Sequence, residues 1–172
     1  MCGPNRASIL TGRSASFHGV VVNNLEVSGD LPTWPELLQK AGYRTGGFGK
    51  FHHTAMQLPL PAEFSHFGYD ESVPTEDPKD GAYLEWIKNE HPEWYETALA
   101  MIWPRPYHSE EFKKQARAAY DKILKTRRDA SEWQTMYPSP LPKELHQTAY
   151  ITDLSIDFIR RHKKNHAASP FM

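Results

Sequence analysis

The residues with the clearest chemical potential lie at the start of the chain, in the segment MCGPNRASILTGR. Its Cys2 is the only cysteine of the 172 residues. Pro4 suits the first turn of a helix, where a missing N–H costs no hydrogen bond, and Gly12 suits a helix end. We therefore predict a short helix with Cys2 at its N-terminal end, where the free N–H groups favour anions. Arg6 would lie about one turn further on, with a permanently charged guanidinium that could reach back toward Cys2.

A second group of polar residues lies in the segment GYRTGGFGKFHH, residues 42–53. It follows TWPE at residues 33–36, a capping-box pattern that predicts a short helix ending near Gly42. A helix, a glycine stop and a strand are typical of α/β proteins. Lys50 and His52 would then lie at the carboxyl end of the strand, where such sheets collect ligands. Strand alternation would place His53 on the other face.

Both segments are similar to motifs of the sulfatase family. The first resembles C-x-P-x-R followed by L-T-G-R, and the second resembles G-Y-x-T followed by G-K-x-H, with Phe51 where the family often has Trp. The alternative is a structural free cysteine beside a capped helix, which seven agreeing positions in the first motif make a poor explanation. The matching residues are Cys2, Pro4, Arg6, Leu10, Thr11, Gly12, Arg13, Gly42, Tyr43, Thr45, Gly49, Lys50 and His52.

The resemblance implies a chemistry. A maturation enzyme would oxidise Cys2 to formylglycine, and one hydroxyl of the hydrated aldehyde would attack the sulfur of a sulfate ester. Arg6 would stabilise this nucleophile, Lys50 would bridge it to the sulfate, and His52 would hydrogen-bond the diol and serve as a candidate base. The expected catalytic residues are therefore Cys2, Arg6, Lys50 and His52, with Lys50 and His52 also binding substrate. His18 either borders the site or is a surface histidine, and is not included among them.

The resemblance also implies calcium in the complete enzyme, with formylglycine from Cys2 as one ligand. The family's other ligands come from a paired-Asp strand before the signature and from a metal-binding motif further downstream, and this chain contains neither. We therefore expect an internal piece of the N-terminal catalytic domain, with no useful calcium binding, weak or no turnover and marginal solubility on its own.

The expected fold is an incomplete α/β/α sandwich of the alkaline-phosphatase-like superfamily, with a mostly parallel sheet and more helix in its second half. Residues 1–53 would form the active-site half and 54–142 a variable loop and helical insertion. Residues 143–172 would form a helix leading into a truncated strand, since Tyr150 to Ile159 resembles the family pattern Y-x-x-D-x-x-I-D-F-I. Residues 81–140 match the family least.

The middle of the chain has few chemical signals. Residues 54–80 are rich in proline, glycine and acidic residues, which predicts a long irregular stretch. The acidic residues lack the spacing of a calcium loop, which favours solvated side chains. The aromatic residues from Tyr83 to Tyr107 could form a sugar platform, but packing onto the domain is the favoured interpretation. The acidic residues are Asp70, Glu71, Glu76, Asp77 and Asp80.

Composition excludes several classes of function. The formal net charge of −1 argues against nucleic-acid and membrane-surface binding. Hydrophobic residues at 39% and charged residues at 24% are typical of a globular chain. A single cysteine excludes an intrachain disulfide or a thiolate zinc cluster. The chain shows no secretory leader, although a complete family member would be expected in the periplasm or outside the cell.

Three functions remain open from the sequence. The first is a sulfuric ester hydrolase acting on a small-molecule or carbohydrate sulfate ester, which leaves choline sulfate, aryl sulfates and sulfated sugars as candidate substrates. The second is a phosphonate or phosphate-ester hydrolase of the same superfamily. The third is a non-catalytic remnant.

Overall fold

The computed structural model describes residues 1–61, 63–125 and 139–172. The chain divides into two compact units. Unit 1 comprises Met1–Glu76 together with Ile151–Met172, and unit 2 comprises Asp77–Tyr150. Unit 1 contains all four of the predicted catalytic residues.

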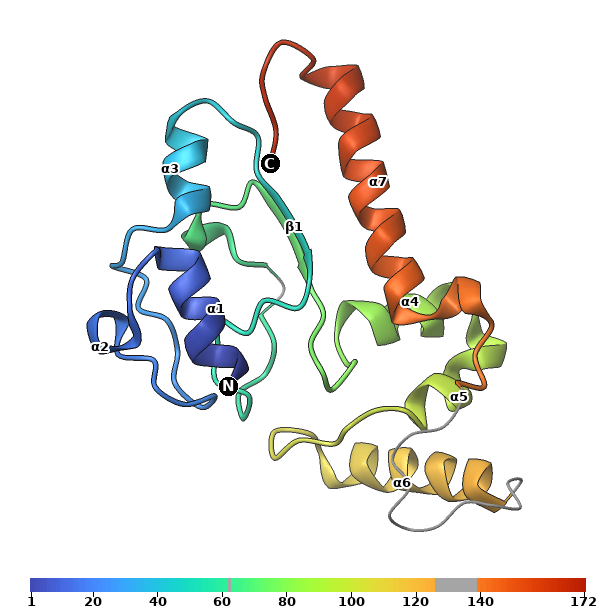
Figure 1. Cartoon of the computed structure of the whole chain (residues 1–172). Coiled ribbons are helices and arrows are strands. Elements are labelled where there is room, and N and C mark those ends of the chain that lie inside the picture. Colours follow the sequence, from blue (N-terminus) through green and yellow to red (C-terminus); the bar gives the residue numbers. More distant parts are fainter. Residues whose placement is uncertain (62, 126–138) are drawn as a thin grey trace. The chain divides into compact units, whose positions relative to one another are not determined.

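Three helices precede the sheet of unit 1 (Figure 1). Helix α1 is Cys2–Thr11, α2 is Ala15–His18 and α3 is Trp34–Lys40. The predicted end of α1 is confirmed, because Gly12 closes it with a φ of 65° and its N–H bonds to Ser8 O. The predicted cap of α3 is confirmed as well, since Thr33 Oγ1 accepts from the Glu36 N–H at 3.3 Å.

Two short strands form a parallel pair in unit 1. Strand β1 is Gly46–Gly49 and β2 is Glu71–Pro74, with Gly46 opposite Glu71 and Gly49 opposite Pro74. A separate parallel bridge joins Arg44 to Phe171, so the chain end pairs as the expected strand would. The prediction of a long irregular stretch over residues 54–80 is wrong for β2 and for the 3₁₀ helix η1, Ser65–Phe67.

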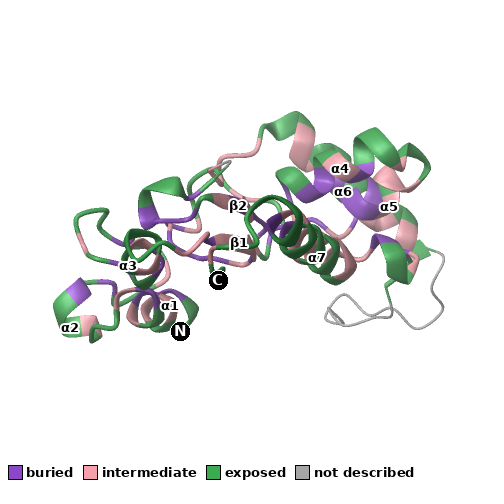
Figure 2. Cartoon of the chain, turned by 90° about the horizontal axis from the view of Figure 1, so that it is seen from above, coloured by how far each residue is buried: buried purple, intermediate pink, exposed green. Residues whose placement is uncertain are grey.

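Helix α7, Gln147–Asn165, confirms the longest predicted helix. Its unit 1 portion lies on one side of the strands, and α1 and α3 lie on the other (Figures 1 and 2). Figure 2 shows exposed residues over much of α7, whose buried residues are Phe158 and His162. The resulting α/β/α layering matches the predicted fold class.

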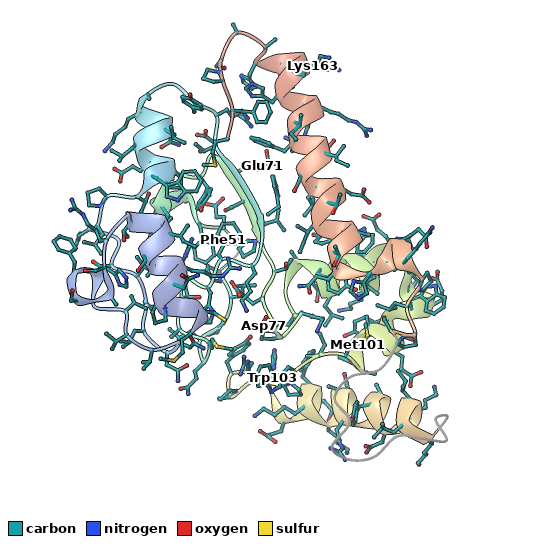
Figure 3. The ribbon with its side chains drawn as sticks, in the orientation of Figure 1. Phe51, Glu71, Asp77, Met101, Trp103 and Lys163 are labelled. Atoms are coloured by element: carbon teal, nitrogen blue, oxygen red, sulfur yellow. The ribbon has the colours of Figure 1, made fainter. Side chains whose placement is uncertain are left out.

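The glycines of β1 are explained by this layering. A Cβ on Gly46 would lie 2.8 Å from the ring of Phe158, and one on Gly47 would lie 2.6 Å from the ring of Phe51. Successive residues of a strand face opposite sides, so each glycine admits an aromatic ring from a different layer. Phe51, labelled in Figure 3, belongs to the main core of unit 1. That core comprises Ala7, Leu10, Val20, Val27, Phe51, Phe64, Phe67 and Tyr69.

Unit 2 is helical in its described residues. It contains α4 (Ala82–Glu90), η2 (Pro92–Trp94), α5 (Tyr95–Leu99), α6 (Glu110–Lys125) and η3 (Lys143–Leu145). Pro92 predicts a break between two short helices, and the structure confirms it, because α4 ends at Glu90 and η2 begins at Pro92. The sequence also predicts a helix over residues 110–128 and a proline-containing linker over 131–142, of which residues 126–138 lie outside the described residues.

The aromatic residues of unit 2 mainly pack its core, as expected. Tyr83 is 1% exposed and its hydroxyl donates to Leu145 O at 2.7 Å. Trp86 stacks on Tyr150 with 4.9 Å between ring centroids. Trp103 is different: 55% of it is exposed, and the Arg105 guanidinium lies 3.8 Å from its ring centroid.

None of the helices in the described parts of the chain is long and apolar enough to span a bilayer.

Candidate active site

The nucleophile candidate is presented by a regular helix. Cys2 is exposed at the first turn of α1. The next residue, Gly3, is buried, and its N–H donates to Asn23 Oδ1 at 3.0 Å. A Cβ on Gly3 would lie 3.3 Å from Asn23, so a larger residue would crowd this contact. The loop carrying Asn23 therefore fixes the start of the helix that holds the thiol.

Lys50 reaches the same helix end from the other motif. Its Nζ lies 4.0 Å from Cys2 Sγ, although the two residues are 48 positions apart in sequence. Arg6 Nη1 donates a hydrogen bond to the Lys50 carbonyl oxygen. The sequence suggested that the Arg6 guanidinium could reach back toward Cys2, but its described hydrogen bond goes to Lys50. Arg6 instead ties α1 to the segment that carries Lys50, because a backbone carbonyl at the end of β1 comes within its reach.

His52 is joined to the helix end through Asn23. Its Nε2 lies 3.3 Å from Asn23 O, and since a carbonyl only accepts, Nε2 is the donor. Asn23 thus contacts both Gly3 and His52, a role that the sequence did not reveal because one polar loop residue carries no pattern. His52 is 4% exposed and has a φ of 55°.

The expected alternation of Lys50, His52 and His53 along a strand is wrong. Strand β1 ends at Gly49, so residues 50–53 form an irregular turn to which period-two alternation does not apply. Both histidines are buried, at 4% and 5% exposure. They are separated by the turn itself, which directs His52 to Asn23 and His53 into an aromatic cluster.

His53 is surrounded by rings. Its ring centroid lies 5.5 Å from that of Phe51, 5.3 Å from Phe64 and 5.1 Å from Phe67. Burial lowers the pKa of His53 to about 3, and the charge of Arg6 contributes in the same direction. Burial also raises the pKa of Tyr69, in the same cluster, to about 12. Both groups are therefore neutral near pH 7.

The turn is closed by a residue that the sequence did not single out. Glu76 Oε1 accepts from the N–H of His52 at 2.6 Å and from the N–H of Phe51 at 3.0 Å. Burial raises the pKa of Glu76, while these two N–H groups lower it and leave a net increase. Its expected role as a solvated acid is wrong, because strand β2 carries it to the turn.

Three other acidic residues of this stretch are also hydrogen-bonded; Asp70 is nevertheless exposed, as predicted, whereas Glu71 is half-buried and Asp80 is buried. Each accepts a hydrogen bond of 2.8 to 2.9 Å, two of them within unit 1 and one within unit 2. The pairs are Asp70 with the Thr45 N–H, Glu71 with Arg161, and Asp80 with His108.

His18 has a structural position. It is 6% exposed, so it is not a surface histidine. Its Nδ1 accepts from the Val20 N–H at 3.1 Å, which leaves the proton on Nε2. Nε2 then donates to Ser8 Oγ at 2.9 Å. A histidine in this tautomer cannot serve Ser8 as a base, and it braces the C-terminal half of α1 against α2.

A cavity of about 350 Å³ adjoins the site within unit 1. Residues of α1 and β1 line it, together with the turn after β1. Its lining includes the cationic side chains Arg6 and Lys50 together with Phe51, His53 and Tyr69 of the aromatic cluster.

The described residues do not by themselves fit a calcium site. Calcium takes six to eight oxygen ligands, most of them carboxylates or carbonyls. No group of three or more His, Cys, Asp or Glu side chains among residues 1–61, 63–125 and 139–172 could hold a metal ion. The charged group that contacts Cys2 is the Lys50 ammonium, which would repel a cation.

A cysteine on a helix N-terminus, faced by a lysine at the carboxyl end of a parallel strand, is an arrangement for nucleophilic attack on an anionic ester. The whole chain, residues 1–172, matches the family described as Sulfatase. The chain therefore belongs to the sulfatase family.

Individual relatives agree with this assignment. The chain is 40% identical over 67 residues to the N-acetylglucosamine-6-O-sulfatase of Bacteroides thetaiotaomicron. The aligned segment is 39% of this chain and 11% of that protein. It is 50% identical over 80 residues to human arylsulfatase G, covering 42% of this chain and 15% of that protein. The chain thus spans a small part of the length of these relatives.

A solved structure extends the likeness to the fold. The structure of the phosphonate monoester hydrolase of Silicibacter pomeroyi is similar to this one, with a TM-score of 0.57 and 21% sequence identity. The alignment covers 96% of this chain and 30% of the hydrolase chain. This likeness concerns the fold, and it confirms the predicted architecture over nearly the whole chain.

Proposed function

We propose that the protein carrying this chain hydrolyses sulfate esters, with Cys2 in its oxidised formylglycine form as the nucleophile. The observation that carries the proposal is the 4.0 Å approach of Lys50 Nζ to Cys2 Sγ. This contact places the Lys50 ammonium, from the second motif, next to the Cys2 side chain of the first motif, 48 residues away in sequence. The Sγ atom occupies the place of the aldehyde oxygen, or of one hydroxyl of its hydrate, and the Cβ atom of residue 2 would be the aldehyde carbon.

The reaction would run in two halves. One hydroxyl of the hydrated aldehyde attacks sulfur, the ester S–O bond breaks, and the alcohol leaves with a proton. The second hydroxyl then loses its proton, the aldehyde re-forms, and sulfate leaves. Water restores the diol, so each cycle consumes one ester and one water.

The described residues can support these steps. Lys50 is a compact cation that suits a tetrahedral anion at Cys2. Arg6 holds the Lys50 carbonyl and so keeps the lysine backbone against α1. His52 is the candidate base for the second half, since an imidazole exchanges a proton near neutral pH. Calcium, which the family implies, would need oxygen ligands from outside the described residues in addition to residue 2, and when bound it would supply Lewis-acid chemistry.

The proposed substrate class is a sulfated carbohydrate. Support comes from the named activity of the Bacteroides relative, an N-acetylglucosamine-6-O-sulfatase, which shares 40% identity over 67 residues with this chain. A formylglycine-generating enzyme is the proposed maturation partner, and the periplasm or the cell exterior is the proposed location.

The test uses the longer protein that carries this chain, produced with a maturation enzyme. Mass spectrometry of the peptide containing residue 2 establishes the formylglycine, and rates are compared on an aryl sulfate, an aryl phosphate and a phenylphosphonate. We expect the highest kcat/KM on the sulfate and a loss of at least about 10⁴-fold in Cys2→Ala.

The matched control is Ser8→Ala, also on α1 but bonded to His18 rather than to the turn. It should retain most of the activity. Preference for the phosphonate would favour the phosphonate hydrolase instead. Equal rates for wild type and Cys2→Ala would favour a non-catalytic remnant.

A further inference from the structure

The turn that carries Lys50 and His52 has an unfavourable backbone. Gly49 has a φ of 108° and His52 a φ of 55°. His52 is one of two non-glycine residues with positive φ among the described residues, the other being Lys79 in unit 2. A histidine does not adopt this conformation by preference, so the surrounding structure has to hold it there.

Two successive N–H groups of this turn point at one oxygen. Glu76 Oε1 accepts from Phe51 N at 3.0 Å and from His52 N at 2.6 Å. Consecutive N–H groups in a turn of mixed right- and left-handed residues form a concave site for an anion. A carboxyl oxygen of this chain fills that site, and it does so on the two residues that follow Lys50.

The position of Glu76 is set by strand pairing. β1 and β2 pair with a constant offset of 25 residues, from Gly46 opposite Glu71 to Gly49 opposite Pro74. The ladder continues past β2, since Thr75 N donates to Gly49 O at 2.8 Å. The same offset places Glu76 opposite Phe51, one of the two residues whose N–H groups it binds. Pairing of the two strands therefore delivers the carboxyl group to the turn.

We propose that Glu76 is a positioning residue of the active site, which holds the turn so that Lys50 lies at Cys2 and His52 lies at Asn23. Glu76 acts on the backbone of this turn through its two hydrogen bonds to the Phe51 and His52 N–H groups. This inference rests on the proposed sulfate-ester hydrolysis for its kinetic consequence, and on the geometry alone for its structural consequence.

The interaction requires an acceptor oxygen rather than a negative charge. A glutamine at position 76 offers an amide oxygen at the same distance from the backbone, whereas alanine offers none and aspartate falls one methylene short. The three substitutions therefore separate the acceptor from the charge and from the length of the side chain.

The experiment compares Glu76→Gln, Glu76→Ala and Glu76→Asp in the longer protein, with Glu26→Ala as the matched control because Glu26 is an exposed acid of the same unit. The first readout is amide hydrogen exchange at residues 51 and 52, which needs no activity. We expect exchange about tenfold faster in the alanine and aspartate variants and unchanged in the other two. If Glu76→Ala does not fold, Glu76→Asp answers the same question.

The second readout is kcat/KM on an aryl sulfate. We expect a loss of about 10²-fold in Glu76→Ala, since a displacement of about 1 Å can cost that much, and a loss of less than about fivefold in Glu76→Gln. Unchanged exchange in Glu76→Ala would overturn the inference. So would an equal kinetic loss in Glu76→Gln and Glu76→Ala with protection intact, because the charge would then matter rather than the acceptor. A wild type without sulfatase activity but with accelerated exchange in Glu76→Ala would refute the proposed function and leave the positioning role standing.

Discussion

Helix α1 and the turn at residues 49–53 each hold half of the candidate site, and they are built in opposite ways. Beyond its first turn, α1 is held by hydrogen bonds within the helix, and it ends at a glycine in the left-handed conformation, where a Cβ would meet nothing within 4 Å. In the turn, the contacts come from residues far away in sequence: Arg6 binds Lys50 O, Asn23 binds His52, and Glu76 binds two N–H groups.

The position of Cys2 therefore depends mainly on α1, whereas the position of Lys50 depends on tertiary contacts of the turn. The helix presents Cys2 mainly through hydrogen bonds within its own ten residues, with one long-range bond from the Gly3 N–H to Asn23 at its start. Lys50 reaches the thiol only when α1, the Asn23 loop and β2 are all in position. We therefore expect substitutions at the turn to cost more than matched substitutions at the helix.

Apart from removal of the nucleophile itself in Cys2→Ala, the largest effect is expected at Lys50, the side chain that the turn places. Lys50→Ala in the longer protein should lower kcat/KM on a sulfate ester by about 10²- to 10³-fold, as for loss of one preorganised charged donor. The kcat/KM of Lys50→Arg should lie between those of the wild type and Lys50→Ala, because the planar guanidinium of arginine does not reproduce a compact ammonium. The control is Lys40→Ala on α3, whose Nζ pairs with Glu36. Steady-state kinetics measure all three, and a loss below about threefold in Lys50→Ala would contradict the placement of Lys50 at the reacting atoms.

The next effect compares two glycines with positive φ. Gly12→Ala should destabilise the protein by about 1 kcal/mol, because a φ of 65° is a mildly unfavourable conformation for alanine and the site is open. Gly49→Ala should cost about 3 kcal/mol, since a φ of 108° lies outside the left-handed well and a Cβ would lie 3.3 Å from Ile151. Urea unfolding of the two variants measures the difference. The reverse order would mean that the turn adapts more easily than the helix end.

The smallest effect is a pH dependence that arises at the turn. The pKa of His53 is about 3 in the folded state, below its ordinary value of 6.5, because burial excludes the charged form. Above pH 6.5 neither state binds the proton and His53 has no effect. As the pH falls below 6.5 the unfolded state gains a proton that the folded state does not, so stability falls. Between pH 7.5 and pH 5 the loss should be about 2 kcal/mol.

The matched variant is His53→Phe, which keeps an aromatic ring among Phe51, Phe64 and Phe67. Subtracting its pH profile of unfolding free energy from that of the wild type isolates the histidine. Superimposable profiles would show that His53 is protonated in the folded protein, contrary to its burial.

Much of the site could be predicted from short segments. The helix that begins at Cys2 and ends at Gly12 follows from local rules for proline and glycine, and Lys50 follows from a motif at a strand end. The fold class also followed, because a capped helix, a glycine stop and a strand repeat a local pattern of α/β proteins. Asn23 and Glu76 could not be predicted, since one asparagine in a loop and one glutamate among five acids have no periodicity that marks them.

The sequence alone determined which groups are available: a thiol at a helix N-terminus, a lysine, two adjacent histidines, and a family assignment. These depend on covalent identity and on hydrogen bonds within a few residues. Tertiary structure decided which of the two histidines faces Asn23 and which is kept neutral among aromatic rings, and it placed a carboxyl oxygen behind the turn. His52 and its partner Asn23 are 29 residues apart and His52 and Glu76 are 24 apart, while Phe64 and Phe67 lie 11 and 14 residues beyond His53, so these contacts exist only when the strands pair and the loops pack. Local preferences for helices, caps and turns do not determine which residues far apart in sequence come into contact.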